Sequence, residues 1–183
     1  MAADQLSLAE WIVLALVREE PRHGFAIARL LDSEGSLGRI WRVPKPVVYR
    51  ALQRLEQLGL VESAELEPSA QGPARSTVSA TRTGQKLAAD WLGQPVVHNR
   101  DVRSELLVKL ALLERAGADP RPLIDAQRTQ LAPVAKALAV RVAEAKGFDR
   151  TLILWRLETL SATLRFLDAL GSPELADSAQ ATS

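Results

Sequence analysis

The chain has 183 residues, 23 basic and 22 acidic side chains and a formal net charge of +1. This length allows one large domain or two small ones, and the near-neutral charge excludes a global field that would attract nucleic acid, so such a site must rest on local clustering. The chain has no cysteine, which excludes disulfides, thiolate catalysis and cysteine-ligated zinc and fits a cytoplasmic protein.

Two helices are predicted near the start of the chain. Ser7-Leu8-Ala9-Glu10 has the pattern of a capping box, and the apolar run after it predicts a helix over about 8–18. That run is too short for a signal peptide or a membrane span. A turn over 19–24 and a second helix over about 24–33 follow, before glycines interrupt the pattern.

A third predicted helix, from residue 45 or 46 to about 58, has two unlike faces. Its apolar residues fall on one face at helical spacing, and its basic and amide residues fall largely off that face. Lysine and arginine reach phosphates, and arginine and glutamine also read base edges. Five cations lie from Arg39 to Arg54 with no acid among them. This cluster favours DNA contact over a merely solvated surface.

Beyond Gly59 the pattern changes to two short strands, over about 60–67 and 75–81, joined by a Pro- and Gly-rich turn at 68–73. Three helices followed by two strands is the order of a winged helix-turn-helix. With a fourth helix over about 83–92, residues 1–93 are predicted to form a DNA-binding domain. The fold class is therefore mainly α with a small β-wing.

Residues 94–171 are predicted to form a helical dimerisation domain, with helices over about 101–116, 121–146 and 150–170, and residues 172–183 a disordered tail. The last helix carries more apolar residues than one stripe can hold, which favours a second subunit over burial within one chain. Trp155 could instead line an effector pocket. The residues predicted in the dimer interface are Leu152, Trp155, Leu160, Leu164 and Leu167.

Several of these segments together resemble the PadR-like transcriptional regulators. The segments that carry the resemblance are Leu6-Ser7-Leu8-Ala9-Glu10, His23-Gly24-Phe25, the stretch 47–61, Gly72-Pro73-Ala74-Arg75 and Thr81-Arg82-Thr83-Gly84. The sequence departs from the family at Val78 and Ala80, where relatives usually carry tyrosine and leucine. It departs again at Pro46-Val47-Val48, so the base preference of relatives does not transfer.

The resemblance implies a homodimeric repressor that binds a palindromic double-stranded operator and is released by a small, often aromatic, effector. It implies no cofactor. The residues expected to contact DNA are Lys45, Val47, Tyr49, Arg50, Gln53 and Arg54 in the third helix and Gly72, Arg75, Ser76 and Thr77 in the wing.

Two other functions compete with this interpretation. A winged-helix module that binds protein rather than DNA remains open, although such a surface has no general need of the cation cluster. An enzyme is disfavoured, because the sequence has no Gly-rich phosphate loop, no recognisable His/Asp/Ser constellation and only two histidines, neither with metal-ligand spacing.

Overall fold

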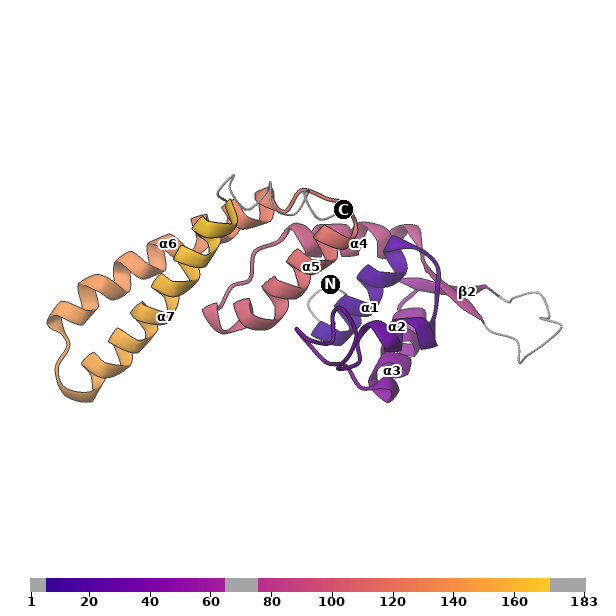
Figure 1. Ribbon diagram of the computed structural model, residues 1–183, viewed down its shortest axis with the longest axis horizontal. Helices are drawn as coiled ribbons and strands as arrows, with labels where there is room; N and C mark the ends of the chain where they lie inside the picture. Colours follow the sequence, from indigo (N-terminus) through magenta and orange to yellow (C-terminus); the bar gives the residue numbers. More distant parts are fainter. Residues whose placement is uncertain (1–5, 65–75, 172–183) are drawn as a thin grey trace. The chain divides into compact units, whose positions relative to one another are not determined.

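The computed structural model describes residues 6–64 and 76–171 (Figure 1). The chain divides into two compact units, residues 1–93 with 103–118 and residues 94–102 with 119–183. The segment 103–118, expected on the C-terminal side of the boundary at Gly93, thus joins the first unit. The predicted wing turn at 68–73 and the predicted tail at 172–183 lie outside the described residues. Among the helices that are described, none has the length and apolarity to cross a bilayer.

The described part of the first unit contains five α-helices and a small antiparallel sheet. The helices are α1 (Leu8–Glu19), α2 (Gly24–Leu30), α3 (Lys45–Gln57), α4 (Arg82–Gly93) and α5 (Leu107–Arg115), and the strands are β1 (Arg22–His23), β2 (Val61–Ala64) and β3 (Thr77–Ala80). The strand order is β1-β3-β2. Both wing strands are confirmed, but β1 lies where only a turn was predicted, because two residues are too few to show an alternating pattern.

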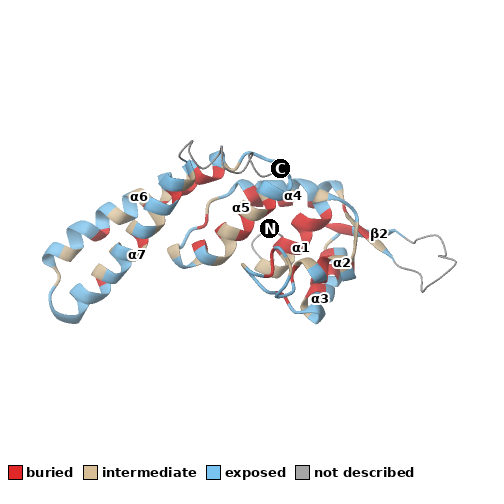
Figure 2. Cartoon of the chain, in the orientation of Figure 1, coloured by how far each residue is buried: buried red, intermediate tan, exposed pale blue. Residues whose placement is uncertain are grey.

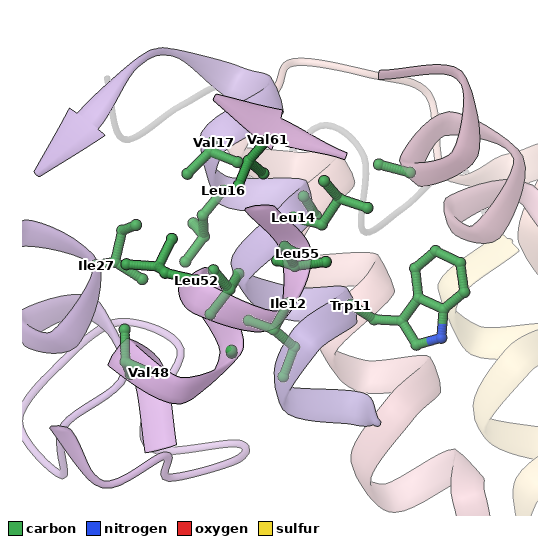
Figure 3. Close-up of a cluster of buried hydrophobic side chains, with 14 of the residues drawn as sticks. Trp11, Ile12, Leu14, Leu16, Val17, Ile27, Val48, Leu52, Leu55 and Val61 are labelled. Carbon is green, nitrogen blue, oxygen red and sulfur yellow. The ribbon is translucent and has the colours of Figure 1, made fainter. Parts of the chain in front are cut away.

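Helix α1 is the centre of this unit. The capping box predicted at its start is present, since the Ser7 backbone N–H donates to Glu10 Oε2 at 2.6 Å and the Glu10 N–H donates to Ser7 Oγ at 3.4 Å. Every residue from Trp11 to Val17 is buried. Helices α3 and α4 pack against α1, and Figure 3 shows its side chains meeting those of α2, α3 and β2. A helix that is apolar on all sides must be enclosed in this way.

Helix α2 ends at Leu30, earlier than predicted, because the chain turns back on itself there. The Leu30 carbonyl accepts hydrogen bonds from the Leu37 and Gly38 backbone N–H groups, each at 3.1 Å. The Val43 N–H donates to the Leu31 carbonyl at 3.0 Å. These bonds fix the connection between α2 and α3, and they set the position at which α3 begins.

The helix predicted over 101–116 is not uniform. A single π-helical stretch, Val102–Leu106, precedes α5. In the first unit, Lys109 is almost fully buried at 1% exposure; its Nζ lies 2.7 Å from Glu105 Oε1 and 4.7 Å from the centre of the Trp91 ring. Trp91 also donates to that carboxylate at 3.0 Å and stacks on Trp11. Side-chain periodicity does not distinguish a π-turn from an α-turn over five residues, so the sequence did not indicate it.

The second unit is dominated by a pair of long helices, α6 (Arg121–Glu144) and α7 (Gly147–Gly171), which run antiparallel. Their buried apolar residues recur at seven-residue spacing: Ile124, Leu131 and Leu138 on α6 and Ile153, Leu160 and Leu167 on α7. Helix α7 begins at Gly147 rather than near residue 150. This first residue adopts a positive φ of 58°, which glycine accommodates without strain where the chain reverses between α6 and α7. Figure 2 shows most of the outer surface of both helices as exposed.

Candidate nucleic-acid interface

Helix α3 is anchored to the first unit by one face. Val48 and Leu55 are 0% exposed, and Ala51 and Leu52 are also buried, so this face lies against α1 and α2. The helix starts directly after Pro44, with Pro46 in its first turn, where a missing N–H costs no helical bond. The anchored face fixes which side chains of α3 point to solvent.

The opposite face of α3 is exposed and cationic. Lys45, Arg50, Gln53, Arg54 and Gln57 are all exposed. Among the described residues, the Arg50 and Arg54 side chains take part in no ion pair. The one acid of the helix, Glu56, accepts a hydrogen bond from the Ser63 hydroxyl of β2 at 2.7 Å. The predicted contacts at Lys45, Arg50, Gln53 and Arg54 therefore share one accessible surface, which we call the α3 cationic face.

Two other residues of α3 that were predicted to contact DNA also pack against the rest of the first unit. Val47 is half-buried and packs against the core of the first unit, so less of it is available than of its neighbours. Tyr49 is 45% exposed, yet its ring is held in place, because a Cβ at Gly24 would lie 3.0 Å from Tyr49 Cε1. The glycine of His23-Gly24-Phe25 is thus needed where α2 and the tyrosine ring meet.

The wing is only partly described. Ser76 is exposed and Thr77 half-buried at the start of β3, and the Ser76 carbonyl lies 3.2 Å from His23 Nδ1. Gly72 and Arg75, the other two predicted wing contacts, lie outside the described residues. His23 has a structural position, as a link between β1 and the wing strand.

The base of the wing is fixed by a compact hydrogen-bonded turn. The Thr81 hydroxyl donates to the Gly59 carbonyl at 2.8 Å and accepts from the Gly84 N–H at 3.2 Å, and the Thr81 N–H donates to the Leu60 carbonyl at 3.0 Å. This turn joins the end of α3, the start of β2 and the start of α4. The Thr81 hydroxyl and the Gly84 N–H are partners in this turn, which explains why threonine and glycine lie three residues apart in Thr81-Arg82-Thr83-Gly84.

Beside the start of α3, the structure adds Phe25 and Arg29, which the sequence did not indicate, to two members of the predicted cation cluster, Arg42 and Lys45. Phe25 is 57% exposed, and Lys45 Nζ lies 5.4 Å from the centre of its ring. Arg29 and Arg42 line the same surface cavity of about 250 Å³, and Arg42 Nε lies 3.6 Å from Asp32 Oδ1. The available signal was an aromatic residue at a helix start, followed by two cations, Arg39 and Arg42, in the connection to the next helix.

The residues predicted in a dimer interface divide into two groups. Leu160 and Leu167 are 2% and 0% exposed within one chain, because they pack against α6, and Leu164 is half-buried. Leu152 and Trp155 are 38% and 67% exposed. Part of the apolar surface of α7 is therefore covered without a second subunit, and the two predicted residues that remain exposed lie in its N-terminal half.

A three-helix scaffold with a two-stranded wing and an exposed cationic third helix is the arrangement of a winged helix-turn-helix domain. Residues 13–90 match the model of the transcriptional regulator PadR-like family. This match confirms the resemblance to the PadR-like transcriptional regulators that the sequence motifs indicated.

Solved structures of similar proteins have low sequence identity to this chain. Bacillus subtilis PadR in complex with operator DNA is 17% identical, with 89% of this chain and 97% of that chain covered and a TM-score of 0.45. The protein smu.1604c from Streptococcus mutans UA159 is 19% identical, with 91% and 98% covered and a TM-score of 0.42. Bacillus subtilis PadR in complex with p-coumaric acid is 16% identical, with 89% and 93% covered and a TM-score of 0.40. No curated protein gives a significant match.

Proposed function

We propose that this protein is a dimeric cytoplasmic repressor that inserts α3 into the major groove of a palindromic operator. The observation that carries the proposal is the α3 cationic face. Arg50 and Arg54 lie one helical turn apart, exposed, without an ion-pair partner among the described residues, on a helix whose other face is fully buried. Such a helix presents cations in a fixed geometry, which suits phosphate and base-edge contacts.

The other predicted contacts have supporting roles in this proposal. Lys45 and Tyr49 contact the DNA from the start of the helix, Gln53 reads a base edge, and Val47 adds an apolar contact. Ser76 and Thr77 approach the backbone from the wing. Two copies reach two half-sites when their recognition helices are about one DNA turn, or roughly 34 Å, apart, which is why a dimer and a palindromic operator go together.

The binding test uses the gene's own upstream region. We expect sequence-selective binding whose affinity falls steeply with salt. Arg50→Ala and Arg54→Ala each weaken binding, and an arginine that contacts only phosphate lowers the slope of log K against log salt by about one. Lys86→Ala is the matched control, because Lys86 is an exposed cation of α4 that pairs with Asp90 on the same helix.

The salt dependence also separates the alternatives. If the full-length protein shows no selective, salt-dependent DNA binding, the winged-helix domain is a protein-interaction module, and the α3 cationic face serves an acidic protein partner instead. If Lys86→Ala weakens binding as much as Arg54→Ala, the attraction is diffuse and the proposed docking of α3 is wrong.

The proposal includes release by a small aromatic effector that binds near Trp155. Its indole is 67% exposed, and an exposed indole offers a stacking surface for an aromatic ring. A screen of simple phenolic acids by thermal shift, followed by operator release, tests this part. A ligand that stabilises the wild-type protein but not Trp155→Ala, and that releases DNA, supports it. Release that is unchanged in Trp155→Ala places the effector elsewhere.

A further inference from the structure

The cavity beside the start of α3 has walls that the backbone fixes. It is lined by α2 and by the connection that leads to α3. This connection turns back closely at its glycines, since a Cβ at Gly38 would overlap the Asp32 carbonyl oxygen. The Val43 N–H then donates to the Leu31 carbonyl at 3.0 Å. These contacts hold the lining in place without a ligand.

One part of the lining is apolar. Ala28 and Val43 are 7% and 3% exposed, and the Phe25 ring beside them is 57% exposed. The cavity has a volume of about 250 Å³, and a cavity of about 150 Å³ is enough for one benzene ring. One ring therefore fits against these side chains, and space remains for a polar group attached to it.

The other part of the lining is charged, and its cations outnumber its acids. Arg42 Nε lies 3.6 Å from Asp32 Oδ1, so these two charges are matched. Arg29 and Lys45 are exposed and take part in no ion pair among the described residues. Lys45 instead has its Nζ 5.4 Å from the centre of the Phe25 ring. Two cations of one cavity are thus left without an anion.

We infer that this cavity binds a small phosphate monoester that carries one apolar ring. A phosphate monoester has a charge of about −1.5 to −2 near pH 7, which matches the two unpaired cations. Its oxygens accept charge-assisted hydrogen bonds from the Arg29 guanidinium and the Lys45 ammonium. The ring packs against Phe25, where aromatic contacts add to the apolar burial. A carboxylate has a smaller charge and leaves one cation unmatched.

The phosphodiester backbone of DNA suits this lining less well. Each backbone phosphate carries one negative charge and has a sugar on both sides, so it meets the cavity only at its mouth. Ala28 and Val43 are then left uncovered. A terminal phosphate with a ring attached reaches the cations and the apolar lining together.

Such a ligand competes with DNA, and this part of the inference rests on the proposed function. Lys45 belongs both to the cavity and to the α3 cationic face. A phosphate bound there occupies its ammonium group and places negative charge where DNA phosphates approach. Operator DNA must weaken ligand binding by the same factor, because the coupling is reciprocal. The cavity thus regulates DNA binding directly, without a change in dimer geometry.

Phenyl phosphate is the probe for the binding test, which uses the full-length protein. The backbone amide signals of Ala28 and Val43 should shift during a nuclear magnetic resonance titration, since both residues line the cavity. Arg29→Gln should weaken binding about tenfold, because it removes a charge-assisted contact. Arg39→Gln is the matched control, since Arg39 is an exposed cation of the connection that does not line the cavity.

Three other probes separate the ring from the charge. Inorganic phosphate has the charge without the ring, benzyl alcohol has the ring without the charge, and benzoate has the ring with one charge. Each should bind about tenfold more weakly than phenyl phosphate. Phe25→Ala should weaken the binding of phenyl phosphate but not of inorganic phosphate, a difference that misfolding does not produce. Benzoate that binds as tightly as phenyl phosphate overturns the assigned ligand class.

Competition is measured with labelled operator at constant ionic strength, with sodium acetate in place of phenyl phosphate as the control. Phenyl phosphate at about ten times its Kd should weaken operator binding about tenfold, and Arg29→Gln should require about tenfold more of it for the same effect. Suppose instead that phenyl phosphate does not displace the operator, whereas Arg29→Gln weakens operator binding as much as Arg54→Ala. The cations of the cavity then contact the DNA backbone, and the inference is wrong.

The outcomes also separate this inference from the proposed function. Unchanged amide signals of Ala28 and Val43 up to about 10 mM phenyl phosphate overturn the site, whatever the protein does with DNA. Shifts confined to the surroundings of Trp155 overturn it too, while the proposed effector position stands. Binding in the cavity by a protein that shows no selective DNA binding supports the site and overturns the proposed function together with the competition.

Discussion

Gly84 is the position where one added methyl group should have the largest effect on the wing. A Cβ at Gly84 would lie 2.0 Å from the Leu60 carbonyl oxygen and 3.2 Å from Leu14 Cδ1. Since carbon and oxygen do not approach closer than about 3 Å, the backbone at Leu60 must move by about 1 Å. Overpacking of this kind costs about 1–3 kcal/mol. The Leu60 carbonyl also accepts the Thr81 N–H, and a weakened bond there adds about 1 kcal/mol.

Alanine gains about 1 kcal/mol over glycine in a helix, so Gly84→Ala should lower the free energy of unfolding of the first unit by about 2 kcal/mol. Urea unfolding followed by near-ultraviolet circular dichroism measures this, because Trp11 stacks on Trp91 with 5.3 Å between ring centres and reports the fold of this unit. Gly93→Ala is the matched control, since the same helix has nothing within 4 Å of a Cβ there. A Gly84→Ala protein as stable as Gly93→Ala would refute the reasoning.

Three further substitutions test the packing of both units. Burial lowers the pKa of Lys109 below its ordinary value of 10.5, so the stability of the first unit should rise with pH as the Lys109 ammonium loses its proton. Lys109→Met removes one partner of the ion pair with Glu105 and should lower the free energy of unfolding by about 2 kcal/mol near pH 7 in urea titrations. Gln127→Leu should destabilise the second unit by about 1–3 kcal/mol, because Gln127 Oε1 accepts the Val96 N–H at 2.7 Å; unchanged amide exchange at Val96 would contradict this. Ser7→Ala removes the capping box and should lower the free energy of unfolding by about 1 kcal/mol. A thermal midpoint equal to that of the wild type would show that the hydrogen bonds between Ser7 and Glu10 do not stabilise the protein.

The α3 cationic face was predictable because helical periodicity and charge are both local properties of the sequence. The alternation of apolar and basic residues over 45–58 specified which side would be buried, and burial of Val48 and Leu55 agrees with it. Its neighbours were not predictable in the same way. Phe25 and Arg29 join this surface because the connection between α2 and α3 folds back on Leu30, which no local pattern indicates.

The last helix shows the opposite case. Its excess of apolar residues was correctly detected in the sequence, but composition did not reveal how those residues are shared among partners. The structure assigns Leu160 and Leu167 to contacts with α6 and leaves Leu152 and Trp155 exposed. A helix with two apolar faces has two partners, and periodicity alone does not say which face meets which partner.

The sequence by itself determined the three-helix and wing order, the capping box at Ser7 and the two-faced third helix, because each depends on residues within one or two turns of each other. Only the tertiary structure decided the strand β1, the π-turn before α5 and the close approach of Gly84 to Leu60. The strand β1 and the approach of Gly84 to Leu60 depend on contacts between segments distant along the chain, and their energies appear only when the backbone has brought those segments together. The π-turn was not indicated because side-chain periodicity over five residues does not distinguish it from an α-turn.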